Sequence, residues 1–419
     1  MSTSVKYMHS GMQNAPQLTN DWGVLVDMLD ACLVNGFNTQ AITSLSRTGT
    51  TATATFGSGH GYVQHQVIQI AGVVETGWNG QYRILSATTN TLTFAVVDTI
   101  ASTATGSMTA KTAPLGFEKP FSGTQKAVYR SPNPLSSRLF LRVDNSLDPV
   151  WTSTYAKYGK VTASDGMSDV DTFTGSQMPY DAANPTKNHV GTGSGSSAIN
   201  GWAKWYYARP AFGADTATPD AGSRSWVLVG DDRGFYFLPA WAAASPRMRA
   251  SYAFNDIKSY KGGDAYKAAF FTTLSYAVAS TNYTPDSNSG MMQSASNGGL
   301  LLKPHNQSGS PVAIGLRTLS LNNAAQISGN TTNNVDSPNP ADNAYVFHPA
   351  YVRESTAGGV LRGEMQGLCW VLQYQPVADM TVLTDVIDSG RAYLMVANAY
   401  YTQEGRILFD ITGPWRDDE

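Results

Sequence analysis

The segment SGHGYVQHQVIQIAGVVETGWNGQYRILSATTNTLTF, residues 58–94, decides how the first part of the chain folds. It belongs to a longer stretch, residues 41–112, in which apolar and polar residues alternate in short runs rich in Val, Ile, Thr and Tyr. Glycines and asparagines separate the runs, as turns between β-strands require. Five or six strands within about 70 residues predict a small β-barrel or sandwich that is a domain in its own right.

The same segment contains residue types that also occur in metal and catalytic sites. His60 and His65 are five residues apart, so on a continuous strand they would point to opposite faces. Glu75 and Trp78 fall in a predicted turn, and no third ligand or nucleophile stands at a suitable spacing. We therefore expect this segment to be structural, with neither a metal nor a catalytic group.

An amphipathic helix is predicted within residues 1–40, before the small barrel. Thr19 or Asn20 can cap its first turn by accepting a hydrogen bond from a backbone N–H, and Gly36 can end it. The apolar residues that recur at helical spacing are Trp22, Leu25, Val26, Leu29 and Leu33. We expect this stripe to pack on the main domain, with a neighbouring subunit as the alternative.

Residues 113–419 predict a larger antiparallel β-sandwich or barrel with long loops, which a boundary near residue 250 would divide in two. The small barrel is then an insertion in a domain that begins with the helix and resumes near Gly116. The strongest hairpin is WVLVGDDRGFYFL, residues 226–238, whose central Gly and Asp residues tolerate a tight turn.

Two later segments are less regular, and the tail returns to strands. Residues 254–271 are expected to hold a short helix. Residues 280–345, rich in Ser, Asn, Thr, Gly and Pro, are expected to form a surface arm that orders against a partner, or a mobile loop. The fold class is therefore mainly β, with one N-terminal helix and one inserted β-module.

Composition limits the kinds of partner. Of the 419 residues, 14% are charged, against about 25% in typical soluble domains, and the formal net charge is −3. No block of like charges predicts binding to nucleic acid or to a membrane, and no segment is long and apolar enough for a signal peptide or a spanning helix. A surface of small uncharged polar residues suits lasting contacts between subunits, although a β-rich protein favours the same residues. The two cysteines, Cys32 and Cys369, fit assembly in a reducing cytoplasm.

No pattern in the sequence predicts catalysis. Asp231 and Asp232 are adjacent, but they lie at a predicted hairpin tip, where aspartates commonly serve the turn. Asp165, Asp169 and Asp171 supply oxygen ligands for Ca²⁺, but without the spacing of an EF-hand. The remaining histidines are isolated: His9, His189, His305 and His348. We expect no catalytic residue, no metal and no cofactor.

Aromatic residues cluster in GWAKWYYARP, residues 201–210. Burial in the core is the commonest fate of such residues, and anchoring of a subunit interface is the second interpretation, with sugar binding third. The candidate interface residues are Trp202, Trp205, Tyr206, Tyr207 and Arg209.

Several of these motifs resemble bacteriophage proteins. The motifs GHGY, GWNGQYRI, NTLTF and ATGSMTA within residues 44–110 look like a small β-module found repeatedly in phage tail, baseplate and fibre-attachment proteins. The motifs FSGTQKAVYRS, WVLVGDDRGFYF and GRILFDITGPWR are similar to a family of virion proteins in tailed phages and prophages. The resemblance implies a structural role in the virion and transfers no catalytic residue.

The resulting hypothesis is a non-enzymatic virion protein of the tail, baseplate or neck. Its expected partners are further copies of itself and other virion proteins, with attachment of a fibre as one role for the small barrel. It would be found in the virion, and in the host cytoplasm during assembly. The alternatives are a capsid decoration protein and a tail protein that binds glycans on the host surface.

Overall fold

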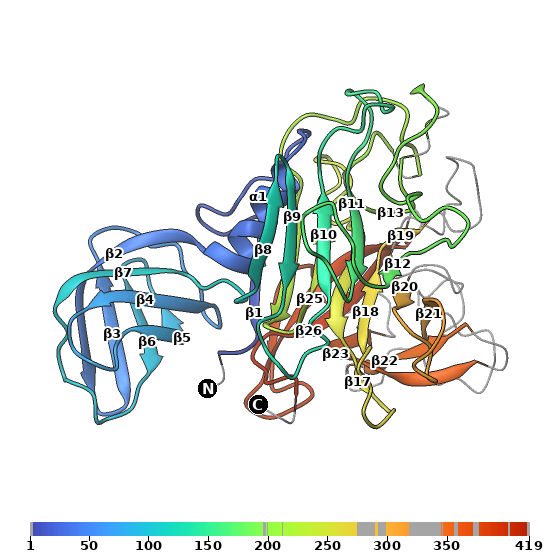
Figure 1. Ribbon diagram of the computed structural model, residues 1–419. Helices are drawn as coiled ribbons and strands as arrows, with labels where there is room; N and C mark the ends of the chain where they lie inside the picture. The colour runs from blue at the N-terminus through green and yellow to red at the C-terminus, as the bar shows by residue number, and fades with distance from the viewer. Residues whose placement is uncertain are drawn as a thin grey trace.

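The computed structural model describes residues 3–195, 198, 200–211, 213–274, 290–291, 299–317, 345, 347–355, 359–371, 377–400 and 403–416. Three sheets dominate this part of the chain, and neighbouring strands within them pair antiparallel (Figure 1). The predicted mainly β fold class is confirmed. Most of the segment 280–345, for which an arm or a loop was predicted, lies outside the described residues. Where it is described, the prediction is wrong at Gly299–Leu301 and Val312–Arg317, which are strands of a sheet.

Residues 37–112 form a closed six-stranded barrel, drawn in blue to cyan at the left of Figure 1. In order around the barrel, the strands are β2 (Phe37–Thr48), β3 (Thr51–Phe56), β6 (Thr91–Ala95), β5 (Gly80–Ala87), β4 (Val67–Val73) and β7 (Gly106–Thr112). One face of each strand points inward, and the barrel has an apolar core of its own that includes Trp78, Ile84 and Phe94. The first and last strands meet at the pair Phe37–Thr112, so the barrel is inserted in the main chain at one place.

The larger sheet has 13 strands and contains the predicted hairpin. Its strands in spatial order are β1 (Lys6–His9), β14 (Trp226–Asp231), β15 (Gly234–Pro239), β16 (Tyr252–Asp256), β18 (Ala268–Phe271), β20 (Gly299–Leu301), β21 (Val312–Arg317), β22 (Phe347–Glu354), β23 (Val360–Val371), β26 (Gln403–Asp410), β25 (Ala392–Tyr400) and β24 (Thr381–Thr384), with β17 (Lys258–Ser259) beside β23. The hairpin β14–β15 turns between Asp231 and Gly234, as predicted.

The smaller sheet has seven strands and packs against the larger one. Its strands are β19 (Thr273–Leu274), β13 (Ala203–Ala208), β11 (Lys157–Ser164), β10 (Phe140–Asp144), β9 (Lys126–Arg130) and β8 (Glu118–Gly123), with β12 (Gln177–Met178) beside β11. Alternate residues, such as Leu141 and Val143, enter the shared core, while Phe140 belongs to a cluster on the other face. The two sheets therefore form a β-sandwich.

The N-terminal helix packs into the core of the sandwich. It consists of α1 (Val24–Asp30) continued by a π-helical turn, η1 (Ala31–Asn35), and it ends at Gly36 as predicted. Leu25, Leu29 and Leu33 are buried in the core shared by the two sheets. The apolar stripe therefore packs on its own chain.

The predicted caps of this helix are wrong. The helix begins after Gly23, which has a left-handed backbone (φ 94°). The Thr19 hydroxyl donates to Asp21 instead, at 2.6 Å. The free N–H of Leu25 donates to Oδ1 of Asn145 at 3.0 Å, so the cap comes from a distant segment.

The short helix predicted within residues 254–271 is also wrong. This segment contains the end of β16, the two-residue strand β17 and the strand β18. Strand β16 lies between β15 and β18 and pairs with both. Strand β18, which contains Ala268 and Ala269, likewise pairs on both sides, with β16 and β20, so sheet pairing overrides the helix propensity of these alanines.

Candidate functional site

The joint between the barrel and the sandwich is organised by one buried cation, Arg83 of β5. Its Nη1 donates to the carbonyl oxygens of His65 and Ile411, both at 2.7 Å. Its Nη2 donates to the carbonyl oxygens of Val5 at 2.7 Å and Thr412 at 3.1 Å. Burial lowers the pKa of Arg83 to about 10, so the guanidinium stays charged at neutral pH. It binds the barrel to segments from both ends of the described chain.

Uncharged contacts support this joint. The Tyr7 hydroxyl of β1 donates to the carbonyl oxygen of Gln64 in the barrel at 3.0 Å. The Asn14 amide donates to Oδ1 of Asn38 at 2.9 Å. Together with the bonds of Arg83, these contacts connect the barrel to three segments outside it, at residues 5–7, at Asn14 and at residues 411–412.

The far end of the barrel points away from the joint. It contains the β2–β3 turn and the loops at 74–79 and 96–105, at the ends of the strands opposite the Phe37–Thr112 pair. Val74 is 74% exposed and Val97 is 62% exposed, the two highest values among the large apolar residues described. This end combines a rigid support with exposed apolar side chains.

The five predicted interface residues are buried, and two of them lie in the core between the sheets. Trp205 of β13 is fully buried and stacks on Tyr252 of the larger sheet, with ring centroids 5.9 Å apart. Tyr207 is also in the shared core, and its hydroxyl donates to the carbonyl oxygen of Asp21 at 2.5 Å. These aromatics join the two sheets to each other.

The other three predicted interface residues are buried as well. Trp202 is 4% exposed, and Tyr206 and Arg209 both bond to Asp215, at 2.7 and 2.5 Å. All five side chains thus follow the alternative of core burial. None of them offers an exposed surface with which to contact a partner or stack on a sugar.

A fully buried lysine, Lys204, stands beside this cluster. Burial lowers its pKa to about 7, and its Nζ donates to Oδ1 of Asn200 at 2.5 Å. A neutral amine can act as a nucleophile, but it needs access to a substrate. Lys204 lines neither of the two cavities described next.

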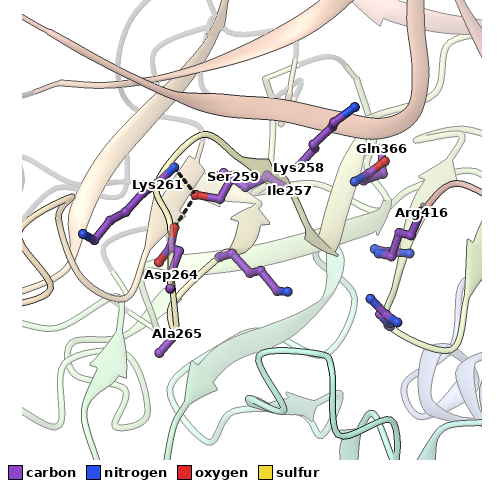
Figure 2. Close-up of a pocket in the computed structure, with 11 residues that line it drawn as sticks. Ile257, Lys258, Ser259, Lys261, Asp264, Ala265, Gln366 and Arg416 are labelled. Carbon is purple, nitrogen blue, oxygen red and sulfur yellow. Dashed lines mark hydrogen bonds between the residues drawn. The ribbon is translucent and has the colours of Figure 1, made fainter. Parts of the chain in front are cut away.

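The first cavity, which we name the basic pocket, has a volume of about 530 Å³. It lies between the loop after β17, the β14–β15 turn, β23 and the C-terminal segment (Figure 2). The charged residues that line it are Lys258, Lys261, Lys267, Arg233, Arg416 and Asp264. Five of these six side chains are cationic.

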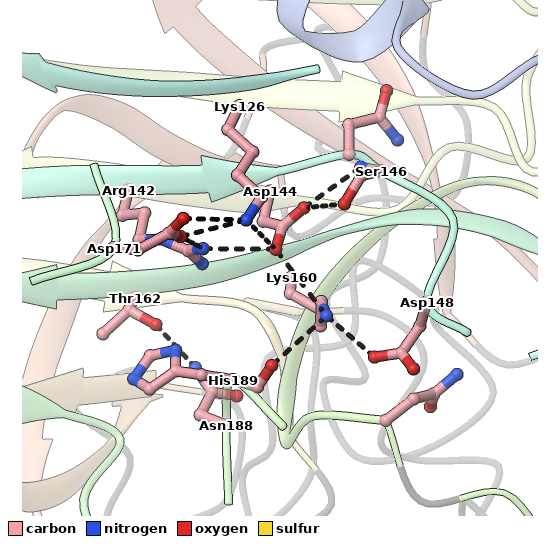
Figure 3. A network of polar contacts seen from close by, with 12 residues as sticks. Lys126, Arg142, Asp144, Ser146, Asp148, Lys160, Thr162, Asp171, Asn188 and His189 are labelled. Atoms are coloured by element: carbon pink, nitrogen blue, oxygen red, sulfur yellow. Dashed lines mark hydrogen bonds and ion pairs between the residues drawn. The ribbon is translucent and has the colours of Figure 1, made fainter. Parts of the chain in front are cut away.

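The second cavity, of about 690 Å³, lies on the outer face of the smaller sheet and contains a network of ion pairs (Figure 3). Lys160 Nζ donates to Asp148 at 2.9 Å and lies 3.6 Å from Asp144. Arg142 also pairs with Asp144, at 3.2 Å, and with Asp171. The network joins β10 and β11 to the loops that cover them.

The network in Figure 3 does not supply an acid catalyst. Burial by itself raises the pKa of Asp144, but Lys160 and Arg142 outweigh it, so the pKa is lowered. A general acid needs a raised pKa. Burial lowers the pKa of His189 to about 3, and its ring stacks on Phe173. The arrangement suits immobilisation of loops better than proton transfer.

The other residues singled out in the sequence are dispersed. His60 is buried and His65 partly buried, in a loop rather than on the predicted strand, and the Glu75 carboxylate accepts two hydrogen bonds from Thr105. The Asp231 carboxylate accepts the backbone N–H of Arg233 at 2.8 Å, as expected at a hairpin turn. The same side chain is also fully buried against Arg416, which sequence reasoning missed.

The acidic triplet does not form a calcium site. Asp165 accepts the N–H of Ser176 at 2.6 Å, whereas Asp171 pairs with Lys126 at 3.0 Å. Among the described residues, no three His, Cys, Asp or Glu side chains gather closely enough to hold a metal ion. Both cysteines are free thiols, and burial raises the pKa of Cys369 to about 12. Within the same residues, no helix has the length and apolar character needed to cross a membrane.

Sequence reasoning also missed Arg83 and the ion pairs around Arg142 and Arg362. Arg83 occupies a position in an ordinary alternating strand, and its partners are backbone oxygens that carry no sequence signal. One indirect signal exists: in FLRVD, residues 140–144, the opposite charges of Arg142 and Asp144 stand two positions apart, on the face away from the core.

Comparisons with known proteins add little. No family model matches the chain, and no curated protein matches it. Among solved structures, the chain aligns with phage phi92 endosialidase at 8% identity, with a TM-score of 0.15, over 90% of this chain and 52% of that one. The chain thus spans about half the length of that structure, and so low a TM-score carries no argument. The resemblance to phage virion proteins accordingly stays a prediction.

Proposed function

We propose that this chain is a structural component of a tailed-phage particle and that it assembles by contacts with further copies and other virion proteins. We place it in the tail, baseplate or neck of the particle, and the alternative among structural roles is decoration of the capsid. The proposal rests on the motifs within residues 44–110, together with the way the barrel formed by these residues is attached.

The attachment of the barrel is the observation that carries the proposal. The barrel has its own apolar core, enters and leaves the sandwich at one place, and is held there by the buried Arg83. A module of this kind presents its far end at a fixed position. The exposed Val74 and Val97 supply apolar contact area at that end.

The glycan-binding alternative loses its main support. It needs an exposed groove lined by aromatic rings, and the aromatic cluster of residues 202–207 that suggested it is buried between and behind the sheets. Asp231 and Asp232 of the hairpin do not form a catalytic pair in a cleft either, because the Asp231 carboxylate forms an ion pair with Arg416.

Purified particles test the proposal directly. The gene is tagged in the phage or prophage that carries it, particles are purified through a density gradient, and the tagged chain is quantified against other virion proteins by mass spectrometry. We expect several copies per particle, in a ratio that matches a symmetric ring. Absence of the chain from infectious, gradient-purified particles would overturn the proposal.

Substitutions at the far end of the barrel test the role of the barrel. We expect the double substitution Val74→Asp, Val97→Asp to reduce incorporation, or to release whatever the barrel contacts, without unfolding the chain. Val190→Asp is the matched control, because Val190 is an exposed valine (54%) of the sandwich. Equal effects of both variants would show that the far end of the barrel has no special role.

A further inference from the structure

The buried amine of Lys204 lies among aromatic rings on the face of the smaller sheet that points away from the shared core. Its Nζ lies 4.6 Å from the ring centre of Tyr158, 5.9 Å from that of Tyr206 and 6.0 Å from that of Trp151. These three rings belong to one apolar cluster, and Lys204 itself is 2% exposed. The rings attract the charged amine, so they hold it in place, and they keep bulk water away from it.

The carboxamide of Asn200 lies against this amine. The chain turns at Gly201, where a φ of 102° favours glycine, and Asn200 comes directly before this turn. Asn200 is 2% exposed, its Oδ1 accepts a hydrogen bond from Lys204 Nζ at 2.5 Å, and its Nδ2 donates to the Tyr158 hydroxyl. Because Cγ of Asn200 is bonded to both of these atoms, the amine is close to the carbon that a nucleophile attacks.

The amine of Lys204 also has a reactive form at neutral pH. Burial lowers its pKa to about 7, although the carboxylate of Asp215 raises it. Lys160, which is paired with Lys204 across β11 and β13, lowers it further. A large part of the amine is therefore neutral at neutral pH, and the neutral amine is the nucleophilic form. Unlike a substrate from solution, the amide of Asn200 needs no path into the protein.

We propose that Lys204 and Asn200 join spontaneously in an intramolecular isopeptide bond. Lys204 Nζ forms a bond to Asn200 Cγ, the bond between Cγ and Nδ2 breaks, and ammonia leaves. Nζ loses one proton and Nδ2 gains one, so the reaction needs no further reactant, and the Tyr158 hydroxyl in contact with Nδ2 passes on this proton. The product fastens the turn at Gly201 to β13. The proposal goes beyond the virion function and does not depend on it.

Peptide mass spectrometry of the purified full chain tests the proposal. Trypsin does not cleave after a lysine whose amine is acylated. We therefore expect the digest of the denatured chain to contain a peptide that includes Asn200, continues past Lys204 and is lighter than its sequence by one ammonia. Peptides of full mass that end at Lys204, without the joined peptide, overturn the proposal.

The position of Cγ-bonded nitrogen loss must also be separated from a competing reaction, because Asn200 precedes Gly201. An Asn–Gly pair loses ammonia when the backbone nitrogen of the glycine closes a succinimide on the asparagine side chain. A succinimide leaves the Lys204 amine unmodified, so trypsin would still cleave after it, and hydroxylamine would cut the chain at Asn200. Loss of ammonia in this form alone overturns the proposal.

Four variants sharpen the test. Lys204→Arg keeps the charge and the tryptic site, and it should restore full mass and cleavage; Asn200→Leu should restore cleavage after Lys204 if Lys204→Arg does not fold. Lys187→Arg is the matched control and should leave the joined peptide unchanged, because Lys187 Nζ also lies over a ring, that of Trp202 at 4.1 Å, but pairs with a carboxylate. Tyr158→Phe should lower the joined fraction, and an unchanged fraction would overturn the proton transfer assigned to Tyr158. Loss of ammonia from the peptide of Lys204→Arg would overturn the isopeptide bond itself.

Discussion

The barrel and the sandwich differ in the number of charged side chains that they bury. The barrel core consists of apolar side chains, and the one buried cation of its strands, Arg83, points out of that core to the joint. The sandwich buries ion pairs throughout, among them Arg362 with Asp264 and Lys160 with Asp148. Burial of apolar area stabilises the barrel, whereas the loops of the sandwich depend on pairs that are costly to break. This difference predicts how each part responds to substitution and to pH.

The largest expected effect comes from Arg362→Met in the sandwich. Arg362 is 1% exposed and donates to Asp264 through Nε at 2.9 Å and Nη2 at 2.8 Å, and it also pairs with Glu354. Its removal leaves two buried carboxylates without a cation, which should lower the free energy of unfolding by about 4 kcal/mol. Urea unfolding of both proteins measures this loss.

A surface ion pair provides the control for Arg362→Met. Lys119 pairs with Asp30 at 2.7 Å but is 30% exposed, so Lys119→Met should cost less than about 1 kcal/mol. Similar losses for the two variants would contradict the distinction between buried and exposed pairs.

The next effect is confined to the barrel. Leu92 of β6 is fully buried in the barrel core, and Leu92→Ala should lower stability by about 3 kcal/mol through lost burial and a cavity. Because the two cores are separate, hydrogen exchange should accelerate at amides of β3 and β6 and stay unchanged in β14 and β15. Accelerated exchange throughout the sandwich would show that the two parts unfold as one unit.

The same contrast explains what the sequence could predict. The barrel was predicted from local alternation, since every strand points one face inward and all strands except β7 pair with the strand before or after them in the chain. The pair Arg362–Asp264 joins residues 98 positions apart, and no periodic pattern identifies one arginine among many as the partner. The cap on Leu25 failed for the same reason, because Asn145 supplies it from 120 positions away. The predicted helix at 254–271 failed because sheet pairing outweighed local propensity.

A third prediction concerns the joint where the two parts meet. Arg83→Met removes a charged donor from three buried carbonyl oxygens of the sandwich, those of Val5, Ile411 and Thr412. We expect a loss of about 2 kcal/mol and a wider distribution of distances between barrel and sandwich, measured by single-molecule fluorescence transfer. Both parts should keep their secondary structure.

Arg47 offers a matched control for Arg83→Met. It also donates to backbone carbonyl oxygens, those of Asp98 and Ile100, but within the barrel at its far end. Arg47→Met should therefore leave the distance distribution unchanged. If both variants widen it equally, Arg83 does not set the orientation.

The smallest effect is a dependence of the sandwich on pH. Burial lowers the pKa of His189 to about 3, below the usual value for histidine, so the folded chain binds fewer protons than the unfolded chain between these two values. Stability is therefore greatest above about pH 6.5, and this group lowers the free energy of unfolding as the pH falls towards 3, by about 1 kcal/mol at pH 5.5.

His189→Gln should remove this part of the acid sensitivity when urea midpoints are compared at neutral and acidic pH. His348→Gln, in β22 of the other sheet, should not. Burial also lowers the pKa of His60 in the barrel, so the test rests on the variants. Equal acid sensitivity of His189→Gln and the unsubstituted chain would show that His189 does not cause it.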